Sequence, residues 1–339
     1  MPEINLLSRK ILRELCSDSR ITITELARKL EVSRPVITRH IEAMERELGL
    51  RYTLALNYNS LGFTKMHLYH ITFSKKPSDE AVLSFLEKSD QIQLAIKTKG
   101  DFDLVMFVLS GDEEEHAKWN LSIALEFAKY GVEVNKSDVD IVHHGFIPID
   151  EKTLAGAKID NHYRKMLLVL NENSRVQNRT MAKRLGLHEE MVRYYMSKLG
   201  SSGIVRRFTT VITTLPPQCA NVLFFARYIY REGHVQRIYD KRKLVYFKKE
   251  QQLPVCNDYQ MVLSISGGEQ DFAWGTASTV KEALEERVGL HAKIFRKDSP
   301  SIRYGIVEKV LKGYMPMRSV DIKARYRTTQ WGSEPNYIG

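Results

Sequence analysis

Polar and basic side chains that could read DNA gather in one short stretch of the chain. Ile37, Ile41 and Met44 recur at helical spacing, so they would face inward and leave the polar residues on the opposite face. An arginine offers two parallel N–H donors to guanine in the major groove, and a threonine hydrogen-bonds a base or contacts a thymine methyl. The pattern predicts contacts with the bases of double-stranded DNA from Ser33, Arg34, Thr38 and Arg39. Phosphate contacts are predicted for the neighbouring Arg28, Lys29 and Arg46.

Three short helices separated by two tight breaks must position this face, over residues 8–44. Apolar residues at helical spacing between Leu7 and Leu15 predict the first helix. The second begins at a capping box, in which Thr22 stands three residues before Glu25. The third begins at a serine that can cap it. This is the pattern of a helix-turn-helix, whose third helix enters the major groove of DNA.

A module that docks another protein is the alternative for this motif. Residues 1–52 carry ten Lys and Arg against eight Asp and Glu, so the local net charge is only +2. Three acids, Glu42, Glu45 and Glu47, follow on the third helix. Arginines on the exposed face nevertheless favour DNA.

The charge of the 339-residue chain, +10 in total, is unevenly distributed. Residues 1–150 hold 19 Lys and Arg against 23 Asp and Glu, so the remaining residues carry a net charge of +14. A basic half suits a polyanion such as DNA, and solubility alone is the alternative reason for it. The three scattered cysteines predict a reducing compartment, the cytoplasm, without disulfides or a cysteine-based metal site. The longest apolar runs are too short to span a bilayer, so no membrane partner is expected.

An α+β unit is predicted to follow the helix-turn-helix. Alternating residues at 49–56 indicate a strand beside the helices, and residues 64–144 have a β-α-β-β-α-β order. This order is typical of a ferredoxin-like sandwich. The predicted strands are 65–73, 91–97, 102–109 and 132–143, and the predicted helices are 78–88 and 113–129.

The pattern then begins again, which indicates an internal repeat. With an offset of 155, Ala27 falls on Ala182 and Met44 on Leu199, while residues 101–113 match residues 258–270 in their alternation. The second half is predicted to contain strands at 222–230, 261–266 and 290–296 and a helix at 273–287. The last residues are predicted to be a basic, poorly packed tail, in which 306–311 could be helical.

The predicted fold class is therefore α+β, with two tandem units that each join a winged-helix-like helix-turn-helix to a ferredoxin-like domain. The predicted boundaries are 1–58 and 159–214 for the two helix-turn-helix domains, 59–147 and 215–298 for the ferredoxin-like domains, 148–158 for a linker and 299–339 for the tail.

The helix-turn-helix followed by a hinge strand, a βαββαβ unit and the stretch KGDFDLVMFV resembles the Lrp/AsnC (feast/famine) transcriptional regulators, of the archaeal type in a tandem-duplicated form. The resemblance covers residues 4–144 well and residues 160–296 weakly. It implies a DNA-binding activator or repressor whose α+β domains pair, here within one chain as a pseudo-dimer. It also implies a small-molecule effector, such as an amino acid, at Gly100, Asp101 and Asp103. A tight turn with solvated acids is the alternative for that stretch.

The second copy of the helix-turn-helix differs from the first in its third helix. This helix opens with His188-Glu189-Glu190, whose carboxylates suit the helix dipole but would repel phosphates. Residues 156–210 carry eleven basic against four acidic residues. The second copy is therefore predicted to anchor on phosphates, and a degenerate structural copy is the alternative. The predicted phosphate contacts are Lys183, Arg184, Arg193 and Lys198.

No cofactor, metal ligand or catalytic residue is predicted, so the protein is not expected to be an enzyme. His67 and His70 would lie on opposite faces of a strand, which argues against a shared metal. The stretch Gly203–Phe208 resembles the hinge strand of siroheme decarboxylases, which share this type of fold. A tetrapyrrole enzyme, with Arg206 and Arg207 near substrate carboxylates, is therefore the first alternative function. A protein-interaction adaptor is the second.

Overall fold

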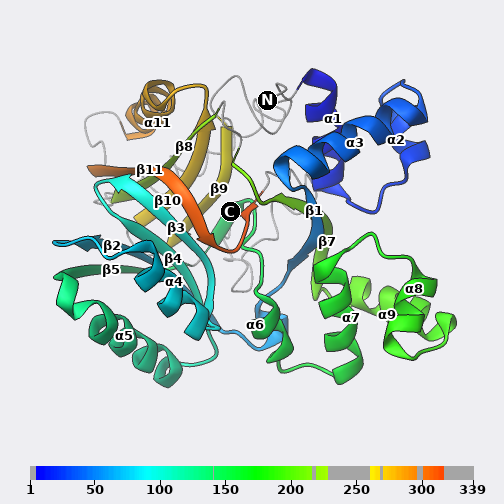
Figure 1. Cartoon of the computed structure of the whole chain (residues 1–339), viewed down its shortest axis with the longest axis horizontal. Coiled ribbons are helices and arrows are strands. Elements are labelled where there is room, and N and C mark those ends of the chain that lie inside the picture. Colours follow the sequence, from blue (N-terminus) through cyan, green and yellow to red (C-terminus); the bar gives the residue numbers. More distant parts are fainter. Residues whose placement is uncertain are drawn as a thin grey trace, which may run out of the picture.

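The computed structural model describes residues 5–139, 141–215, 219–227, 260–267, 270–295 and 301–316 (Figure 1). It contains two three-helix units, on the right of Figure 1, and one large sheet system on the left. Among the described residues, no helix is long and apolar enough to cross a membrane.

The first three-helix unit forms where the sequence predicts it. Its helices are α1 (Leu6–Ser17), α2 (Ile23–Lys29) and α3 (Arg34–Leu48). Thr22 and Glu25 form the predicted capping box, and hydrogen bonds from Thr22 hold the pKa of the Glu25 carboxyl below its ordinary value. Ser33 stands at the start of α3, but its side chain makes no capping hydrogen bond. Its predicted capping role is therefore wrong, and its hydroxyl is left for other partners.

A second three-helix unit follows the first α+β domain. Its helices are α7 (Asn161–Glu172), α8 (Asn178–Leu185) and α9 (Glu189–Ser201). The predicted linker 148–158 is not a plain linker, because it contains the short helix α6 (Glu151–Ala155) with Thr153 and Leu154 buried. The second unit is therefore attached through packed structure.

Within the described residues, the large sheet has nine strands in the order β5-β2-β4-β3-β11-β8-β10-β9-β6. The first four strands belong to the first half of the chain and the next four to the second half, and each set has the strand arrangement of a βαββαβ ferredoxin-like domain. Strands β5 and β6 stand at the two ends of this order but are consecutive in the chain, so the two ends of the strand order lie next to each other. The strands are β2 (Lys65–Phe73), β3 (Ile92–Gly100), β4 (Leu104–Ser110), β5 (Val132–Asp138), β6 (Ile141–His144), β8 (Ala220–Arg227), β9 (Gln260–Gly267), β10 (Gln270–Ala277) and β11 (Ser301–Lys312).

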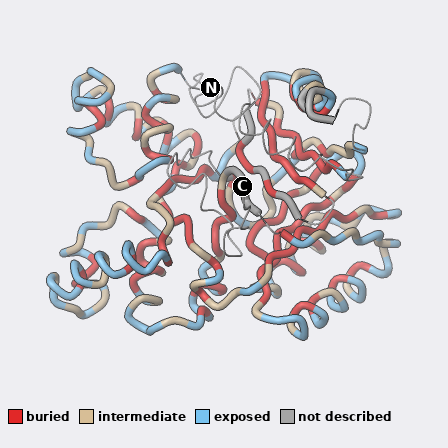
Figure 2. The backbone as a smooth tube through the Cα atoms, turned by 180° about the vertical axis from the view of Figure 1, so that it is seen from behind, coloured by how far each residue is buried: buried red, intermediate tan, exposed pale blue. Residues whose placement is uncertain are grey.

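Helices cover the outer faces of this sheet system. In the first half these are α4 (Asp79–Lys88) and α5 (Glu113–Phe127), and α5 is followed by a short 3-10 turn, Ala128–Tyr130. In the described part of the second half it is α11 (Val280–Phe295). Figure 2 shows that the buried residues follow the strands, while the outward sides of the helices are exposed.

The two halves pair with each other through their fourth strands. The first part of β11 pairs with β8 of its own half, and its last part pairs with β3 of the other half. In the same way, β6 extends the line of β5 and pairs with β9. Aromatic side chains fill the space between the halves: Phe107 packs edge-on against Phe272 with ring centroids 5.3 Å apart, and Phe102 against Phe225 at 5.0 Å. The halves are therefore paired within one chain, in the manner expected of a pseudo-dimer.

A second, smaller sheet ties the two three-helix units together. Its strands β1 (Arg51–Leu56) and β7 (Val205–Ile212) pair antiparallel, and β12 (Met315–Pro316) adds to β7. The turn after α1 packs on β7, where the Ser19 N–H donates to the Phe208 carbonyl, and the turn after α7 packs on β1, where the Ser174 N–H donates to the Tyr52 carbonyl. Each three-helix unit thus rests on the hinge strand of the other half.

The hydroxyls of Ser19 and Ser174 meet at the centre of this arrangement, 2.6 Å apart and fully buried. Arg20 lies over the ring of Phe208, and Arg175, its counterpart, lies over Tyr52. The 155-residue offset predicted from sequence is therefore realised as an approximate two-fold symmetry.

The end of the second half differs from the prediction. Residues 301–312, assigned to a tail with a helical segment at 306–311, form β11 between the two halves, and residues 290–295, assigned to a strand, continue α11. The predicted boundary at 298 is therefore wrong. Residues 299–300 and 317–339 of the predicted tail lie outside the described residues.

The proposed match of residues 101–113 with 258–270 is also wrong. The first stretch leads into β4, the third strand of its domain, whereas the second forms β9, a second strand. Period-two alternation is common to all strands, so it does not identify which strands correspond. The counterpart of Gly100 is Gly267, which likewise ends a second strand.

A candidate nucleic-acid interface

The exposed face of α3 carries all four predicted base-reading residues. Ile37, Ile41, Met44 and Leu48 are buried, whereas Ser33, Arg34, Thr38 and Arg39 are exposed. None of these four side chains forms an ion pair or a side-chain hydrogen bond with another described residue. Two guanidinium groups and two hydroxyls are thus presented without internal partners, which is the arrangement that direct base readout requires.

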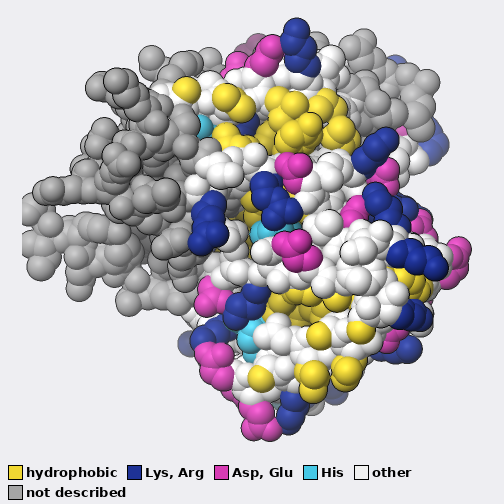
Figure 3. All heavy atoms as spheres, turned by 90° about the vertical axis from the view of Figure 1, so that its left-hand side faces the viewer, with side chains coloured by type: hydrophobic (Ala, Val, Ile, Leu, Met, Phe, Trp, Pro, Cys, Tyr) yellow, Lys and Arg dark blue, Asp and Glu magenta, His cyan; other side chains and the backbone are white. Residues whose placement is uncertain are grey.

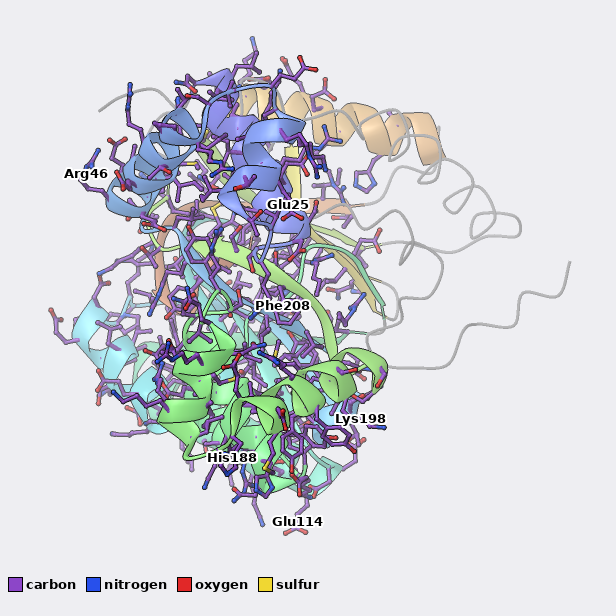
Figure 4. The ribbon with its side chains drawn as sticks, turned by 90° about the vertical axis from the view of Figure 1, so that its right-hand side faces the viewer. Glu25, Arg46, Glu114, His188, Lys198 and Phe208 are labelled. Atoms are coloured by element: carbon purple, nitrogen blue, oxygen red, sulfur yellow. The ribbon has the colours of Figure 1, made fainter. Side chains whose placement is uncertain are left out.

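The basic residues predicted to flank this face are not equivalent to one another. Arg28 is exposed on the same unit. Lys29 is paired with Glu14 on α1 at 2.5 Å, and Arg46 with Glu47 at 3.2 Å. Figure 4 shows Arg46 pointing outward at the edge of the first unit. Exposed pairs of this kind are weak, so Lys29 and Arg46 remain able to exchange a carboxylate for a phosphate.

The second three-helix unit lies on the same side of the molecule as the first, with Phe208 between them (Figure 4). Its α9 occupies the place of α3, but its cations are mostly engaged internally. Arg193 pairs with Glu189 at 2.7 Å, Arg184 pairs with Glu172 at 2.5 Å, and Lys198 lies 5.6 Å from the ring centroid of Tyr194. Of the four predicted phosphate contacts, Lys183 is exposed with no ion pair to another described residue. The surface of α9 is also more apolar, because Met191 and Tyr194 are 40% and 57% exposed.

The predicted effector residues form the hairpin between β3 and β4, where β11 of the other half clamps them. The Asp101 carboxylate accepts a hydrogen bond from the Tyr304 N–H at 2.8 Å, and the Asp101 carbonyl accepts one from Arg303. Gly100 has a φ of +147°, and a Cβ there would lie 2.6 Å from the Tyr304 carbonyl oxygen. Gly100 is therefore needed for this close approach of the two halves.

The carboxylate of Asp103 is engaged as well. It accepts the Phe73 N–H at 2.9 Å and pairs with Lys76 at 2.8 Å. A ligand ammonium group would have to displace these partners, and the corresponding ones of Asp101, to bind here.

A cluster of histidines that the sequence did not predict lies under α5. His67 of β2 and His116 of α5 are buried with their rings stacked at 3.5 Å, and His67 Nδ1 contacts Asp138 at 2.8 Å. Burial lowers the pKa of His67 to about 4, which keeps its imidazole neutral at pH 7. Their separation of 49 positions left no local signal. Among the described residues, no group of three or more His, Cys, Asp or Glu side chains could hold a metal ion.

His70 points to the opposite face of β2, into the space between the two halves. It packs against Phe225 at 4.3 Å, and its Nε2 lies 3.5 Å from an Arg303 nitrogen. Burial lowers its pKa to about 4 as well. His67 and His70 therefore pack into two different cores, on opposite faces of β2, as the alternation of side chains along a strand predicts.

Fold and interface together define an α+β protein with an N-terminal helix-turn-helix followed by ferredoxin-like domains. The model of a winged helix-turn-helix DNA-binding family matches residues 4–47. The chain is 32% identical over 124 residues to the proline dehydrogenase transcriptional activator of Rhodobacter capsulatus, a match covering 34% of this chain and 77% of that protein. It is 29% identical over 144 residues to an uncharacterized HTH-type transcriptional regulator of Pyrococcus furiosus, covering 38% of this chain and 95% of the relative. The chain belongs to the Lrp/AsnC-like family of helix-turn-helix regulators.

The whole chain also has a structural counterpart. The crystal structure of the siroheme decarboxylase NirDL in complex with an iron-uroporphyrin III analogue matches 94% of this chain and 95% of its own, with a TM-score of 0.54 and 14% sequence identity. At this identity the match shows that the two chains share a fold. It extends the likeness beyond the 34–38% of this chain that these two relatives match.

Proposed function

We propose that this protein is a sequence-specific DNA-binding regulator of transcription whose first helix-turn-helix reads the bases. One observation carries the proposal: Ser33, Arg34, Thr38 and Arg39 are exposed together on α3 and have no internal partners among the described residues. An exposed arginine without a carboxylate partner is ready to donate to guanine at no cost of breaking an ion pair. Family membership and the winged helix-turn-helix match at residues 4–47 support the same function.

The second helix-turn-helix is proposed to hold phosphates rather than to read bases. Lys183 is available, while Arg184, Arg193 and Lys198 must first leave Glu172, Glu189 and the Tyr194 ring. Each exchange lowers the net gain from a phosphate contact, so the contribution of this unit is weak and independent of sequence.

Because the two faces differ, the preferred DNA should be asymmetric. A symmetric dimer reads a palindrome with two identical helices, whereas this chain presents two different ones side by side. Site selection with the full chain on random duplexes tests this. We expect one well-specified half-site with a weakly specified flank about one helical turn away. A strong inverted repeat would contradict it, because two first units from different chains would then be reading together.

An amino acid or similar small molecule is proposed as the effector at the Gly100–Asp103 hairpin. A ligand ammonium would replace Lys76 at Asp103 or the Tyr304 N–H at Asp101. Because β11 is part of the clamp, such binding would act where the two halves meet. Calorimetric titration of the wild type and of Asp103→Asn with amino acids measures it, and heat that is unchanged by the substitution would place the ligand elsewhere.

A tetrapyrrole decarboxylase is the second candidate, favoured by the fold shared over 94% of the chain. Its proposed carboxylate-binding residues, Arg206 and Arg207, are half-buried, and Arg207 lies over the Phe146 ring at 6.0 Å. Purified protein distinguishes the candidates. An absorption band of a bound tetrapyrrole, together with no retardation of DNA, would favour the enzyme. A third candidate, the protein-interaction adaptor, would show neither.

A further inference from the structure

The outward side of α5 is apolar where a surface helix is expected to be polar. The inward side packs His116, Trp119, Ile123 and Phe127 against the first sheet. On the outward side, Leu121 and Leu125 are 60% and 70% exposed. They form a stripe at helical spacing together with the exposed residues Ala117, Ala124 and Ala128. We call these five residues the α5 stripe.

The equivalent helix of the second half shows that the stripe is not imposed by the fold. Helix α11 covers the second sheet, and the exposed residues described on it are mostly charged, namely Lys281, Glu285 and Glu286, with Val288 at 50% exposure and Ala292 as smaller apolar ones. Among the described residues, α11 therefore exposes mainly charged side chains, whereas α5 exposes two leucines and neighbouring alanines beside polar residues such as Lys118 and Ser122. Contiguous exposed apolar surface of this kind marks a binding site.

The α5 stripe is complementary to itself. Two leucines flanked by alanines allow the large side chains of one helix to lie over the small ones of another copy that runs antiparallel. The charges agree with this arrangement, since Glu113, Glu114 and Glu115 stand at the N-terminus of α5 and Lys129 lies just past its C-terminus. Glu113 and Glu114 pair with Lys65 and Lys118 within the chain, but these exposed pairs are weak and can exchange. Antiparallel pairing brings each acidic end beside the other copy's lysine and opposes the helix dipoles. A second copy of this chain is therefore the occupant that fits.

The position of α5 decides what such a pair would do. Along the longest axis of the molecule, α5 lies at the opposite end from both three-helix units (Figure 1). Figure 3, which faces that end, shows hydrophobic side chains at the level of α5 and a further group above them, at the level of α11. Two copies joined here would present their DNA-reading faces at opposite ends of the pair, too far apart and wrongly directed to read one palindrome.

We propose that the protein self-associates through the α5 stripe and thereby bridges two separate DNA duplexes. The bridging rests on the proposed DNA-binding function, whereas the self-association does not. One helix pair buries less surface than a standard interface, so we expect an association in the micromolar range. The pair would form at high local concentration, such as on neighbouring DNA sites.

Analytical ultracentrifugation of the full chain tests the self-association. The wild type should show a concentration-dependent dimer, and Leu121→Asp with Leu125→Asp should raise the dissociation constant about 100-fold. Both side chains are mostly exposed, so the fold should be retained, which circular dichroism checks. The matched control is Val288→Asp on α11, which should dimerise like the wild type. A monomeric wild type at about 100 μM, or a dimer unchanged by the double substitution, would overturn the proposal.

A charge exchange tests the antiparallel orientation. Lys129→Glu should weaken the dimer, and adding Glu114→Lys should restore it. Failure of the second substitution to restore it would refute the orientation.

Bridging is measured by capturing a fluorescent duplex on beads that carry an unlabelled one. Wild type and Val288→Asp should capture it, while the Leu121 and Leu125 variant should bind a single duplex normally but capture nothing. If no variant binds DNA, the proposed function fails while the centrifugation result stands. If a fully dimeric protein binds DNA without capture, the bridging role is refuted.

Discussion

Helices α3 and α9 occupy equivalent places in the two halves but differ in where their charges end. On α3, Arg34 and Arg39 are exposed and no carboxylate in the described part of the chain pairs with them, whereas on α9 Arg193 is held by Glu189. The helical framework is nearly the same in both, with an apolar inward side built by residues such as Ile37 and Val192. The difference therefore lies in the side chains that the framework presents. A count of basic residues favours the second unit, but the pairing of those residues favours the first.

The largest effect is expected when the two base-reading arginines of α3 are removed. Arg34→Ala with Arg39→Ala should weaken binding to the selected DNA by about 2–6 kcal/mol in total, because each lost base contact is worth about 1–3 kcal/mol. Binding to random DNA should change far less. The matched control replaces the equivalent residues of α9, Glu189→Ala with Tyr194→Ala, and should leave site preference unchanged. Fluorescence anisotropy on both duplexes measures this, and equal losses on cognate and random DNA would mean that α3 holds only phosphates.

A second difference between the halves concerns their first strands and should show as pH dependence. Strand β2 buries His67 and His70, whereas at the 155-residue offset β8 has Val222 and Phe225. The folded-state pKa of each histidine is about 4, below its ordinary 6.5, so only the unfolded chain binds the proton between these values. Stability should therefore fall as the pH drops from about 6.5 to about 4, by at most about 3 kcal/mol per histidine.

Urea unfolding at several pH values measures that loss. Introducing the β8 residues, as His67→Val with His70→Phe, should flatten the pH dependence in this range. The reciprocal change, Val222→His with Phe225→His, buries two histidines on β8 and should make the loss of stability at low pH larger. A pH profile that the substitutions at His67 and His70 leave unchanged would contradict the assignment.

The hydrogen bond between Ser19 and Ser174 lies on the approximate two-fold axis, so removing either hydroxyl should lower the stability by a similar amount. Ser19→Ala or Ser174→Ala leaves one buried hydroxyl without its partner, at a cost of about 1–3 kcal/mol of unfolding free energy. The double variant should cost less than the sum, since no unpaired hydroxyl remains. Thermal or denaturant unfolding of the three variants gives the coupling. Strictly additive losses would show that the two serines do not depend on each other.

The smallest effect is expected on the salt dependence of binding. Arg193→Ala with Lys198→Ala should reduce the slope of log affinity against log salt by at most about 2, without altering site preference. Glu189→Gln should make the slope steeper, because it releases Arg193 from its ion pair. An unchanged slope in both variants would show that α9 stays away from phosphates.

Local patterns predicted the first half of the molecule well. The capping box at Thr22 and the alternation at 65–73 predicted α2 and β2, because caps and periodicity are properties of neighbouring residues. The same helical spacing also predicted which residues of α3 are exposed. The helical spacing did not predict that the basic residues of the second three-helix unit are paired within the unit, because such pairing depends on side-chain rotamers.

The second half was predicted less well because its order depends on distant contacts. Strand β11 is basic and punctuated by glycine, and it is a strand because β3 and β8 pair with it. A sequence signal did exist: GFIP at 145–148 and GYMP at 313–316 follow the two fourth strands. Gly145 and Gly313 have φ values of +73° and +80°, and a Cβ on either would lie within 2.5 Å of a carbonyl oxygen of the opposite half. At both places where the chain passes from a fourth strand along the opposite half, the close approach of the two backbones therefore requires a glycine.

The pairing of β11 with β3 also has a consequence for how the chain is made. Strand β3 is synthesised early, but the strand that completes its hydrogen bonds comes near the end of the described chain. Until then the first half carries an unpaired sheet edge, the kind of edge that joins other chains during folding. Contacts between such distant segments also slow folding, because a long loop must close before they form. A sequence built as a repeat is therefore not two independent folding units, because the sheet of its first half is completed by the last strand of its second half.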